Sequence, residues 1–212
     1  MSGRVRVKMC GITNRRDAEA AIMLGADALG FNLFPGSKRY IDLDENAEWI
    51  AALPPFVAKV AVLVNAPFEE ARRVALHPVI NLVQLHGDED RDYCRMFAAL
   101  GRPFIKALRI RDASDASEAA KYLTRNVLID AHVAGEFGGT GATIALPLAR
   151  EIVTRHPRLR IILAGGLTPE NVDEAVCAVR PFAVDVASGI EATARKKDAA
   201  KMASFIETVR AA

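Results

Sequence analysis

Apolar and polar side chains alternate over residues 5–10, and this period of two predicts a β-strand with two unlike faces. One face carries Val5, Val7 and Met9. The other carries Arg6, Lys8 and Cys10, which places a thiol at the end of the strand beside an ammonium group. Gly11 then turns the chain. Thr13 or Asn14 is placed to cap a following helix, with Asp17 at the capping-box position.

Strand-like and helix-like patterns continue to alternate along the whole chain. Further strands are predicted over 27–34, 57–64, 81–85, 103–108, 126–130, 160–163 and 183–186. Helices are predicted over 17–24, 44–53, 68–76, 88–100, 114–123, 144–155, 169–179 and 198–209. The strands are short and rich in Val, Ile and Leu, as parallel strands covered by helices are. Their even spacing favours a single (β/α)₈ TIM barrel over an open doubly wound sheet, with residues 1–212 as one catalytic domain.

Composition narrows the class of protein. Hydrophobic residues make up 51% of the 212 positions and charged residues 25%, which is typical of a soluble globular protein. No apolar run approaches the ~18 residues of a membrane span, and the N-terminus lacks a signal-peptide core, so a cytoplasmic protein without membrane contact is expected. A net charge of +2 gives no field that favours nucleic acid.

The three cysteines are widely spaced, which argues against a disulfide framework or a zinc site, and no bound metal is expected. Cys94 and Cys177 fall on predicted helices and are interpreted as core thiols. Cys10 differs from them, because the end of a barrel strand is where active sites lie. By itself Cys10 also fits a small buried residue of a core strand.

A carboxyl group stands at the matching place on the sixth strand. Asp130 ends the run 127–130 and shares the predicted inner face with Leu128. Such a residue is either functional or a helix cap. The first and sixth strands lie on different sides of a barrel, so Cys10 and Asp130 are expected to face each other across its mouth. A base on one side and an acid on the other suit a proton-transfer isomerase.

Glycine-rich turns follow the last three strands and point to a phosphate site. They are Gly138, Gly139 and Gly141 after the sixth strand, Gly165 and Gly166 after the seventh, and Ser188 and Gly189 after the eighth. A single such turn needs no function, but barrels often bind phosphate with their final loops and nearby helix N-termini. A nucleotide cofactor is not expected, because neither a Walker-type lysine nor a dinucleotide fingerprint is present.

Three more polar residues at strand ends join the predicted substrate-binding set. Arg39 follows the second strand in a turn opened by 35–36, where a guanidinium could hold a carboxylate or phosphate in a bidentate pair, or simply lie at the surface like Lys38. His86 follows the fourth strand and either contacts substrate or orients its own loop. Asp185 lies in the eighth strand, shortly before Ser188.

The motifs at these strand ends resemble, in order and over almost the whole chain, those of the phosphoribosylanthranilate isomerases of tryptophan biosynthesis. They are Lys8-Met9-Cys10-Gly11-Ile12-Thr13, Gly30-Phe31, Ser37-Lys38-Arg39-Tyr40, Gln84-Leu85-His86-Gly87-Asp88-Glu89, Asp130 with Gly138-Gly139-Thr140-Gly141, Ala164-Gly165-Gly166-Leu167-Thr168-Pro169-Glu170-Asn171-Val172, and Asp185-Val186-Ala187-Ser188-Gly189-Ile190-Glu191. The first motif and the one that begins at Ala164 are the most specific.

The resemblance implies an Amadori rearrangement of N-(5-phosphoribosyl)anthranilate to the 1-deoxyribulose 5-phosphate ketosamine, without metal or cofactor. It implies that Asp130 protonates the furanose ring oxygen and that Cys10, as thiolate, removes the C2′ proton. It also implies that Arg39 holds the anthranilate carboxylate, and that the loops at Gly139, Gly166 and Ser188-Gly189 hold the phosphate. The expected partner is this small phosphorylated substrate, and the expected assembly is a monomer or a homodimer.

One stretch departs from the family pattern. Where the family usually continues with Phe-Asp-Trp after the glycine loop, this chain reads Ala142-Thr143-Ile144-Ala145-Leu146-Pro147. Asp130 is followed by Ala131-His132, where Lys is frequent at the second position. The catalytic pair is kept, and the aromatic end of the substrate site is altered.

Two alternatives remain open from the sequence. One is the related aminoaldose isomerase of histidine biosynthesis, which is longer and normally carries a carboxylate where Cys10 stands. The other is a non-catalytic barrel that binds phosphorylated sugars or a partner protein. Retention of both Cys10 and Asp130 argues against the second alternative.

Overall fold

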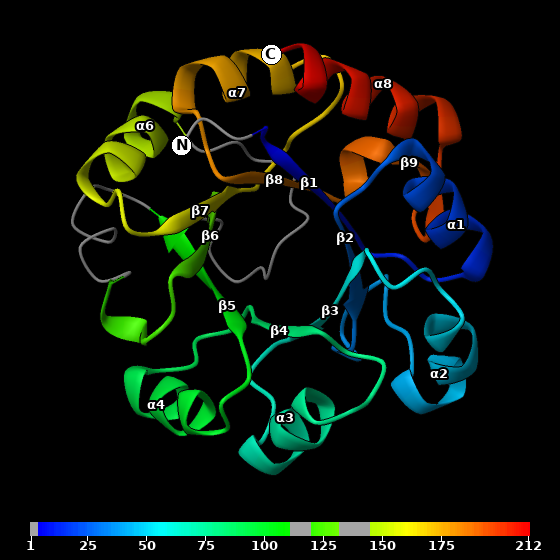
Figure 1. The fold of residues 1–212 in the computed structure, drawn as a ribbon, viewed down its shortest axis with the longest axis vertical. Coiled ribbons are helices and arrows are strands. Elements are labelled where there is room, and N and C mark those ends of the chain that lie inside the picture. Colours follow the sequence, from blue (N-terminus) through cyan, green and yellow to red (C-terminus); the bar gives the residue numbers. More distant parts are fainter. Residues whose placement is uncertain (1–3, 111–119, 132–144) are drawn as a thin grey trace.

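The fold is described from a computed structural model, which covers residues 4–110, 120–131 and 145–212. Its centre is a closed barrel of eight parallel strands, each hydrogen-bonded to the next, with β1 also paired to β8 (Figure 1). The strands are β1 (Arg6–Cys10), β2 (Ala28–Asn32), β3 (Ala58–Leu63), β4 (Leu82–Leu85), β5 (Phe104–Ile110), β6 (Asn126–Ala131), β7 (Arg160–Leu163) and β8 (Ala183–Val186). The predicted TIM barrel is therefore confirmed.

Helices surround the barrel and cover its outer face (Figure 1). In the described ranges they are α1 (Arg15–Leu24), α2 (Leu43–Ala51), α3 (Phe68–Ala75), α4 (Arg91–Ala99), α6 (Leu146–Arg155), α7 (Val172–Val179) and α8 (Ala199–Ala211). Two short 3₁₀ helices are η1 (Ala120–Tyr122) and η2 (Ser188–Ile190). A small antiparallel sheet joins β9 (Glu191–Thr193) to β10 (Lys196–Lys197).

The alternation along each strand separates two cores. On β1, Val7 and Met9 join the apolar layer between barrel and helices, whereas Lys8 and Cys10 lie on the other face. Inside the barrel a smaller cluster fills the lumen: Val60, Ile105, Ala107, Leu128, Ile162, Ala164 and Ala183. Because the barrel's inner positions are few, each polar residue there takes the place of a packing side chain. Four buried polar residues of the barrel strands replace apolar ones in this way: Lys8, Gln84, Asp130 and Asp185.

Several helix ends differ from the predicted ones by a few residues, for local reasons. Asn14, not Thr13, caps α1 by accepting a hydrogen bond from the backbone N–H of Asp17. Asp90 caps α4, so this helix starts after the predicted position 88. Helix α7 begins at Val172 and not at Pro169. Residues 114–119 of the predicted fifth helix lie outside the described ranges, and residues 120–122 are 3₁₀ helix.

The predictions for the two helix cysteines had different outcomes. Cys94 is buried in α4, as expected for a core thiol. Cys177 is exposed, so its interpretation as a core residue was wrong. It lies on the solvent side of α7, because Val172, Ala175, Val176 and Val179 form the buried side. Within the ranges covered by the structure, no helix is both long and apolar enough to cross a membrane.

Candidate active site

Most of the predicted site residues lie at the C-terminal ends of the barrel strands or in the segments that follow them. Cys10 is the last residue of β1, and Asp130 is the last but one of β6. Strands β7 and β8 lie between them around the barrel (Figure 1). Gly139 was predicted in the same region, but it lies outside the described residues. The remaining predicted residues fall into three polar clusters and one pair of adjoining loops.

Cys10 belongs to a buried cluster with Lys8 and Asp185. The ammonium of Lys8 donates a hydrogen bond of 2.7 Å to Oδ1 of Asp185, and both side chains are less than a tenth exposed. The parallel register of β1 and β8 creates this contact, because it sets Lys8 directly beside Asp185. Asp185, which was predicted to bind substrate, is therefore the ion-pair partner of Lys8.

Gly30 of β2 provides the space for this cluster. A Cβ atom at Gly30 would lie 2.7 Å from Sγ of Cys10 and 3.0 Å from Nζ of Lys8. The thiol and the ammonium thus occupy neighbouring positions over the same glycine. Any larger residue at Gly30 would displace one of them, since non-bonded carbon atoms pack at about 3.5–4.0 Å.

The surroundings of Cys10 act on its thiol in opposite directions. Burial raises the pKa of Cys10 above its ordinary value and is the largest effect. The positive charge of Lys8 lowers this pKa, the carboxylate of Asp185 raises it, and Lys197 lowers it. Lys8 does favour the thiolate, as the sequence indicated, but burial outweighs it and the net shift is upward.

A second cluster joins Arg39 to Glu191 and Lys197. Nε and Nη2 of Arg39 each donate a 2.7 Å hydrogen bond to one carboxylate oxygen of Glu191. Lys197 is buried and donates to the carboxylate of Glu191 at 3.1 Å and to the backbone carbonyl of Cys10 at 2.7 Å. The small β9–β10 sheet, which carries Glu191 and Lys197, therefore ties Arg39 to the end of β1.

Sequence reasoning named Arg39 but missed the roles of the other two members of this cluster, Glu191 and Lys197. Lys197 follows Arg195 and Lys196, and such a run of charges is typical of a solvated surface. Burial raises the pKa of Glu191, but hydrogen bonds and charges from Arg39 and Lys197 outweigh it and hold the pKa below its usual range. The hydrogen bonds to Glu191 in turn raise the pKa of Arg39.

The third cluster surrounds Asp130. Nε2 of His86 lies 3.6 Å from Oδ2 of Asp130, and Nδ1 of the same ring lies 2.6 Å from the amide nitrogen of Gln84. His86 thus contacts the predicted catalytic carboxyl, in addition to belonging to its own loop. A cavity of about 370 Å³ opens here. Its described lining is His86, Gly87, Asp88, Glu89, Lys106, Ala107, Leu108, Arg109, Tyr122 and Asp130.

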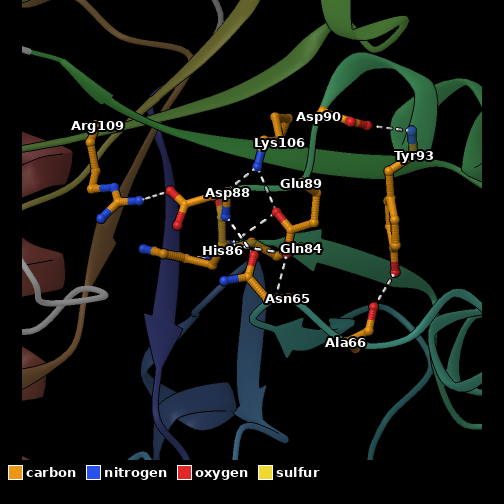
Figure 2. Close-up of polar contacts among 11 residues, drawn as sticks. Asn65, Ala66, Gln84, His86, Asp88, Glu89, Asp90, Tyr93, Lys106 and Arg109 are labelled. Atoms are coloured by element: carbon orange, nitrogen blue, oxygen red, sulfur yellow. Dashed lines mark hydrogen bonds and ion pairs between the residues drawn. The ribbon is translucent and has the colours of Figure 1, made fainter.

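Ion pairs hold the loop after β4, which lines this cavity, and Figure 2 shows their side chains. Lys106 donates to Glu89 at 2.6 Å, and both side chains are almost completely buried. Glu89 also accepts hydrogen bonds from the backbone N–H groups of Asn65 and Gly87. On the open side, Arg109 pairs with Asp88. Since Glu89 satisfies donors from three segments, it fixes the loop that carries His86.

The glycine turns after β7 and β8 adjoin each other. Gly165 and Gly166 have φ values of +89° and +59°, a region in which side chains are strained. At Gly189 a Cβ would collide with the backbone carbonyl of Leu167, so only glycine allows the two loops to touch. Backbone groups of both turns are therefore close together, as a shared anion site requires.

An eight-stranded barrel with a thiol and a carboxyl at its strand ends defines an α/β-barrel enzyme. Residues 7–208 match the family described as N-(5'-phosphoribosyl)anthranilate isomerase, and the chain belongs to that family. The resemblance inferred from the strand-end motifs is thereby confirmed. Membership of this family shows that the barrel belongs to an enzyme and not to a binding module.

Known relatives agree over the full length of the chain. The chain is 45% identical over 207 residues to an N-(5'-phosphoribosyl)anthranilate isomerase from Neisseria meningitidis, covering 97% of this chain and 96% of the relative. It is 39% identical to a solved phosphoribosylanthranilate isomerase in complex with reduced 1-(o-carboxyphenylamino)-1-deoxyribulose 5-phosphate. That match has a TM-score of 0.83 and covers 98% of this chain and 100% of the other.

A third relative bears on assembly. The isomerase of Thermotoga maritima is described as dimeric, and monomers generated from it have been solved. This chain is 37% identical to those monomers with a TM-score of 0.83, and the match covers 98% of this chain and 100% of the other. Both assembly forms therefore occur for the same barrel.

Proposed function

We propose that Asp130 and Cys10 are the acid and the base with which this chain isomerises N-(5-phosphoribosyl)anthranilate in tryptophan biosynthesis. The reaction is that of the family: an Amadori rearrangement that converts an aminoaldose to a ketosamine, 1-(2-carboxyphenylamino)-1-deoxyribulose 5-phosphate. Membership of the family over residues 7–208 carries the choice of reaction. The positions of Cys10 and Asp130 at the ends of β1 and β6 support the choice of residues.

In the first step Asp130 acts as general acid. Its carboxyl proton moves to the furanose ring oxygen, the bond from that oxygen to the anomeric carbon breaks, and a Schiff base forms with the anthranilate nitrogen. Asp130 is mostly buried and lines the cavity. A positioned acid is needed because the ring oxygen is a poor leaving group without its proton.

In the second step Cys10 acts as general base. Its thiolate removes the C2′ proton, and the electron pair of the C–H bond moves toward the protonated Schiff base to give an enolamine. Tautomerisation of the enolamine then yields the ketone. Lys8 supports this step, because its ammonium stabilises the thiolate against the cost of burial.

The substrate ends are assigned to opposite parts of the barrel mouth. The adjoining turns at Gly166 and Ser188-Gly189, together with Gly139, are proposed to bind the phosphate. Arg39 is proposed to bind the anthranilate carboxylate with the edge of its guanidinium that Glu191 does not use. His86 and Asp185 are proposed to act through Asp130 and Lys8, the residues that they contact.

Substitution of the two proposed catalytic residues tests this assignment. Cys10→Ser and Asp130→Asn preserve side-chain size, so both proteins should fold normally. Each should lower kcat by roughly 10²-fold or more, the scale of general acid–base catalysis. Turnover is measured as the loss of anthranilate fluorescence, with substrate made in situ, and circular dichroism checks folding. Near-normal turnover in either folded variant would refute the role given to that residue.

We further propose that residues 1–212 act as one cytoplasmic catalytic domain, a monomer or a homodimer, which needs no cofactor, metal, membrane or nucleic acid. All three cysteines are free thiols, which suits a reducing compartment. Light scattering coupled to size-exclusion chromatography would decide between the two assemblies. Activity that disappears after treatment with a chelator would contradict the metal-free reaction.

A further inference from the structure

We propose that Gln84 is a positioning residue that selects the tautomer of His86 and thereby fixes which oxygen of Asp130 delivers the acid proton. The inference rests on the proposed role of Asp130 as general acid. It concerns a side chain that makes no contact with the proposed reacting groups itself. The relay runs from the middle of β4, through the residue that follows this strand, to the end of β6.

Gln84 is an unusual residue for its position. Its neighbours Val83 and Leu85 face the helices, so Gln84 points into the barrel, where it is completely buried. Its amide nitrogen lies 2.6 Å from Nδ1 of His86. Its amide oxygen has no hydrogen-bond partner in the part of the chain that the structure describes. A buried amide with an unpaired oxygen is costly, which indicates that its contact with His86 matters.

The amide orientation determines the tautomer of the ring. An amide nitrogen can only donate, so the Nδ1 that it faces must present a lone pair, and a neutral imidazole then carries its proton on Nε2. Rotating the amide by half a turn would exchange its oxygen and nitrogen. Both N–H groups of Gln84 would then be buried at the position where the oxygen now has no partner. Unpaired buried carbonyls are tolerated more often than unpaired buried N–H groups. The observed orientation is therefore the favoured one.

The Nε2 proton of His86 faces one particular oxygen of Asp130. Nε2 lies 3.6 Å from Oδ2, longer than a direct hydrogen bond but typical of catalytic pairs before substrate tightens them. Because Nε2–H is a donor, Oδ2 must remain an acceptor. The proton of the neutral carboxyl is then held on Oδ1, so the relay aims the acid before the substrate arrives.

Charged groups near His86 leave this assignment intact. The loop after β4 contributes Asp88 and Glu89, β5 contributes Lys106 and Arg109, and β6 contributes Asp130. Lys106 is paired with Glu89, and Arg109 with Asp88, so these charges are largely balanced among themselves. Among the described residues, Gln84 contacts Nδ1 and Asp130 lies beside Nε2.

Nitrogen-15 spectroscopy of the ligand-free protein tests the relay directly. The ¹⁵N signals of the four histidines separate protonated from unprotonated ring nitrogens, and the His86→Asn variant identifies the signals of His86. Wild-type His86 should show a proton on Nε2 and none on Nδ1. In Gln84→Glu, a carboxylate accepts where an amide donated, so Nδ1 should become protonated. A wild-type proton on Nδ1, or an unprotonated Nδ1 in Gln84→Glu, would overturn the inference.

The separate effects on kcat and KM distinguish positioning from a structural role. Gln84→Glu and the nearly isosteric Gln84→Met should lower kcat roughly tenfold, a fraction of what the acid itself contributes, while KM stays within about twofold. Gln84→Met also serves if the buried charge of Gln84→Glu prevents folding. An unchanged kcat in a folded Gln84→Met would refute the relay. Full turnover in Asp130→Asn would instead refute the proposed acid, and the tautomer of His86, measured without substrate, would distinguish the two failures.

Discussion

Arg39 and Glu191 form a two-point ion pair in which one edge of the guanidinium, Nε and Nη2, is held by both oxygens of the carboxylate at 2.7 Å. The pair spans 152 positions of the sequence. It leaves the second edge of the fork, formed by Nη1 and Nη2, to bind another planar anion. Glu191 therefore orients Arg39 toward a ligand and does not compete with it.

Arg39→Ala should weaken binding of the substrate or product by about 1.5–3 kcal/mol, the scale of a hydrogen bond to a charged group. The loss should appear as a raised KM, or a raised product inhibition constant, with a smaller change in kcat. Lys38→Ala is the matched control, because Lys38 is the adjacent cation and is exposed. Equal effects of the two substitutions would show that only general surface charge was lost.

Glu191→Gln should change both the orientation of Arg39 and the stability of the fold. The substitution keeps the shape but removes the charge shared by Arg39 and Lys197, so KM should rise and the free energy of unfolding should fall by about 1.5–3 kcal/mol. The pKa of Glu191 is lowered in the folded protein. The ionised Glu191 therefore stabilises the folded protein fully above its unfolded pKa of ~4.3. This stabilisation is lost as the pH falls through the lower pKa that Glu191 has in the folded protein. Urea unfolding from pH 3 to 7 should show this dependence in the wild type and lose it in the variant.

Removing the charge of Lys8 should move the pH dependence of Cys10. The thiolate is the proposed base, so activity rises as the pH passes through the pKa of the thiol. Lys8 lowers that pKa, and Lys8→Met should consequently shift the rising limb of kcat/KM to higher pH. The pH dependence of the rate at which iodoacetamide alkylates Cys10, measured by mass spectrometry, should shift in the same direction.

Two features of the chain control the Lys8 experiment. Lys59→Met removes another buried lysine, on β3, and should leave the pH profile of Cys10 in place. Burial raises the pKa of Cys94 to about 11, so Cys94 should react slowly and serve as an internal reference. A Lys8→Met profile that coincides with the wild-type profile would show that Asp185 neutralises Lys8 completely.

The barrel and its strand ends could be predicted because they depend on local patterns. Inward and outward positions alternate along each strand, so Cys10 could be placed on the face opposite Val7 and Met9, and Asp130 on the inner face with Leu128. Parallel strands in a closed barrel end at one rim. The residues at the strand ends could therefore be assigned to one site without any knowledge of their contacts. The short sheet from Glu191 to Lys197 followed no such pattern and was not predicted.

The partners of the predicted residues could not be found in this way, since they depend on register and on distant loops. Lys8 meets Asp185 because β1 and β8 pair in one particular register, and a shift by one residue would send the two side chains to opposite faces. Gln84 resembled any polar residue near a strand end until its burial and its contact with His86 were visible.

The adjoining glycine turns should bind an inorganic anion. Crystals grown with sulfate or phosphate should hold the anion against the backbone N–H groups near Gly166 and Ser188-Gly189. Gly189→Ala should abolish that binding and raise the KM of the phosphorylated substrate, because the added methyl collides with the carbonyl of Leu167 and pushes the loops apart. Gly101→Ala controls for general backbone strain, because Gly101 has a φ of +67° with open space around it and lies between α4 and β5. An anion found only at Lys38 would contradict this phosphate site.

The segment that departs from the family pattern should affect recognition of the anthranilate ring more than catalysis. Ala145 and Leu146 take the place of an expected acidic and aromatic pair, and Leu146 is the first residue of α6. Residue 144 lies outside the described ranges. Cys10, Asp130 and the turns proposed to bind phosphate are all retained, so the proton transfers should remain fast.

A missing apolar contact is worth only about 1–3 kcal/mol of discrimination, so the expected result is a raised KM with a smaller change in kcat. Restoring Phe, Asp and Trp at positions 144–146 should lower KM, while replacing the same positions with three alanines controls for the exchange of Ile144 and Leu146. Because the loosened site involves only the ring end, analogues with altered rings should also be accepted. The deciding measurement is kcat/KM for phosphoribosylanthranilate against that for the aminoaldose of histidine biosynthesis. A preference for the second substrate would show that the altered segment changes the choice of substrate, in a barrel whose acid, base and glycine turns are unchanged.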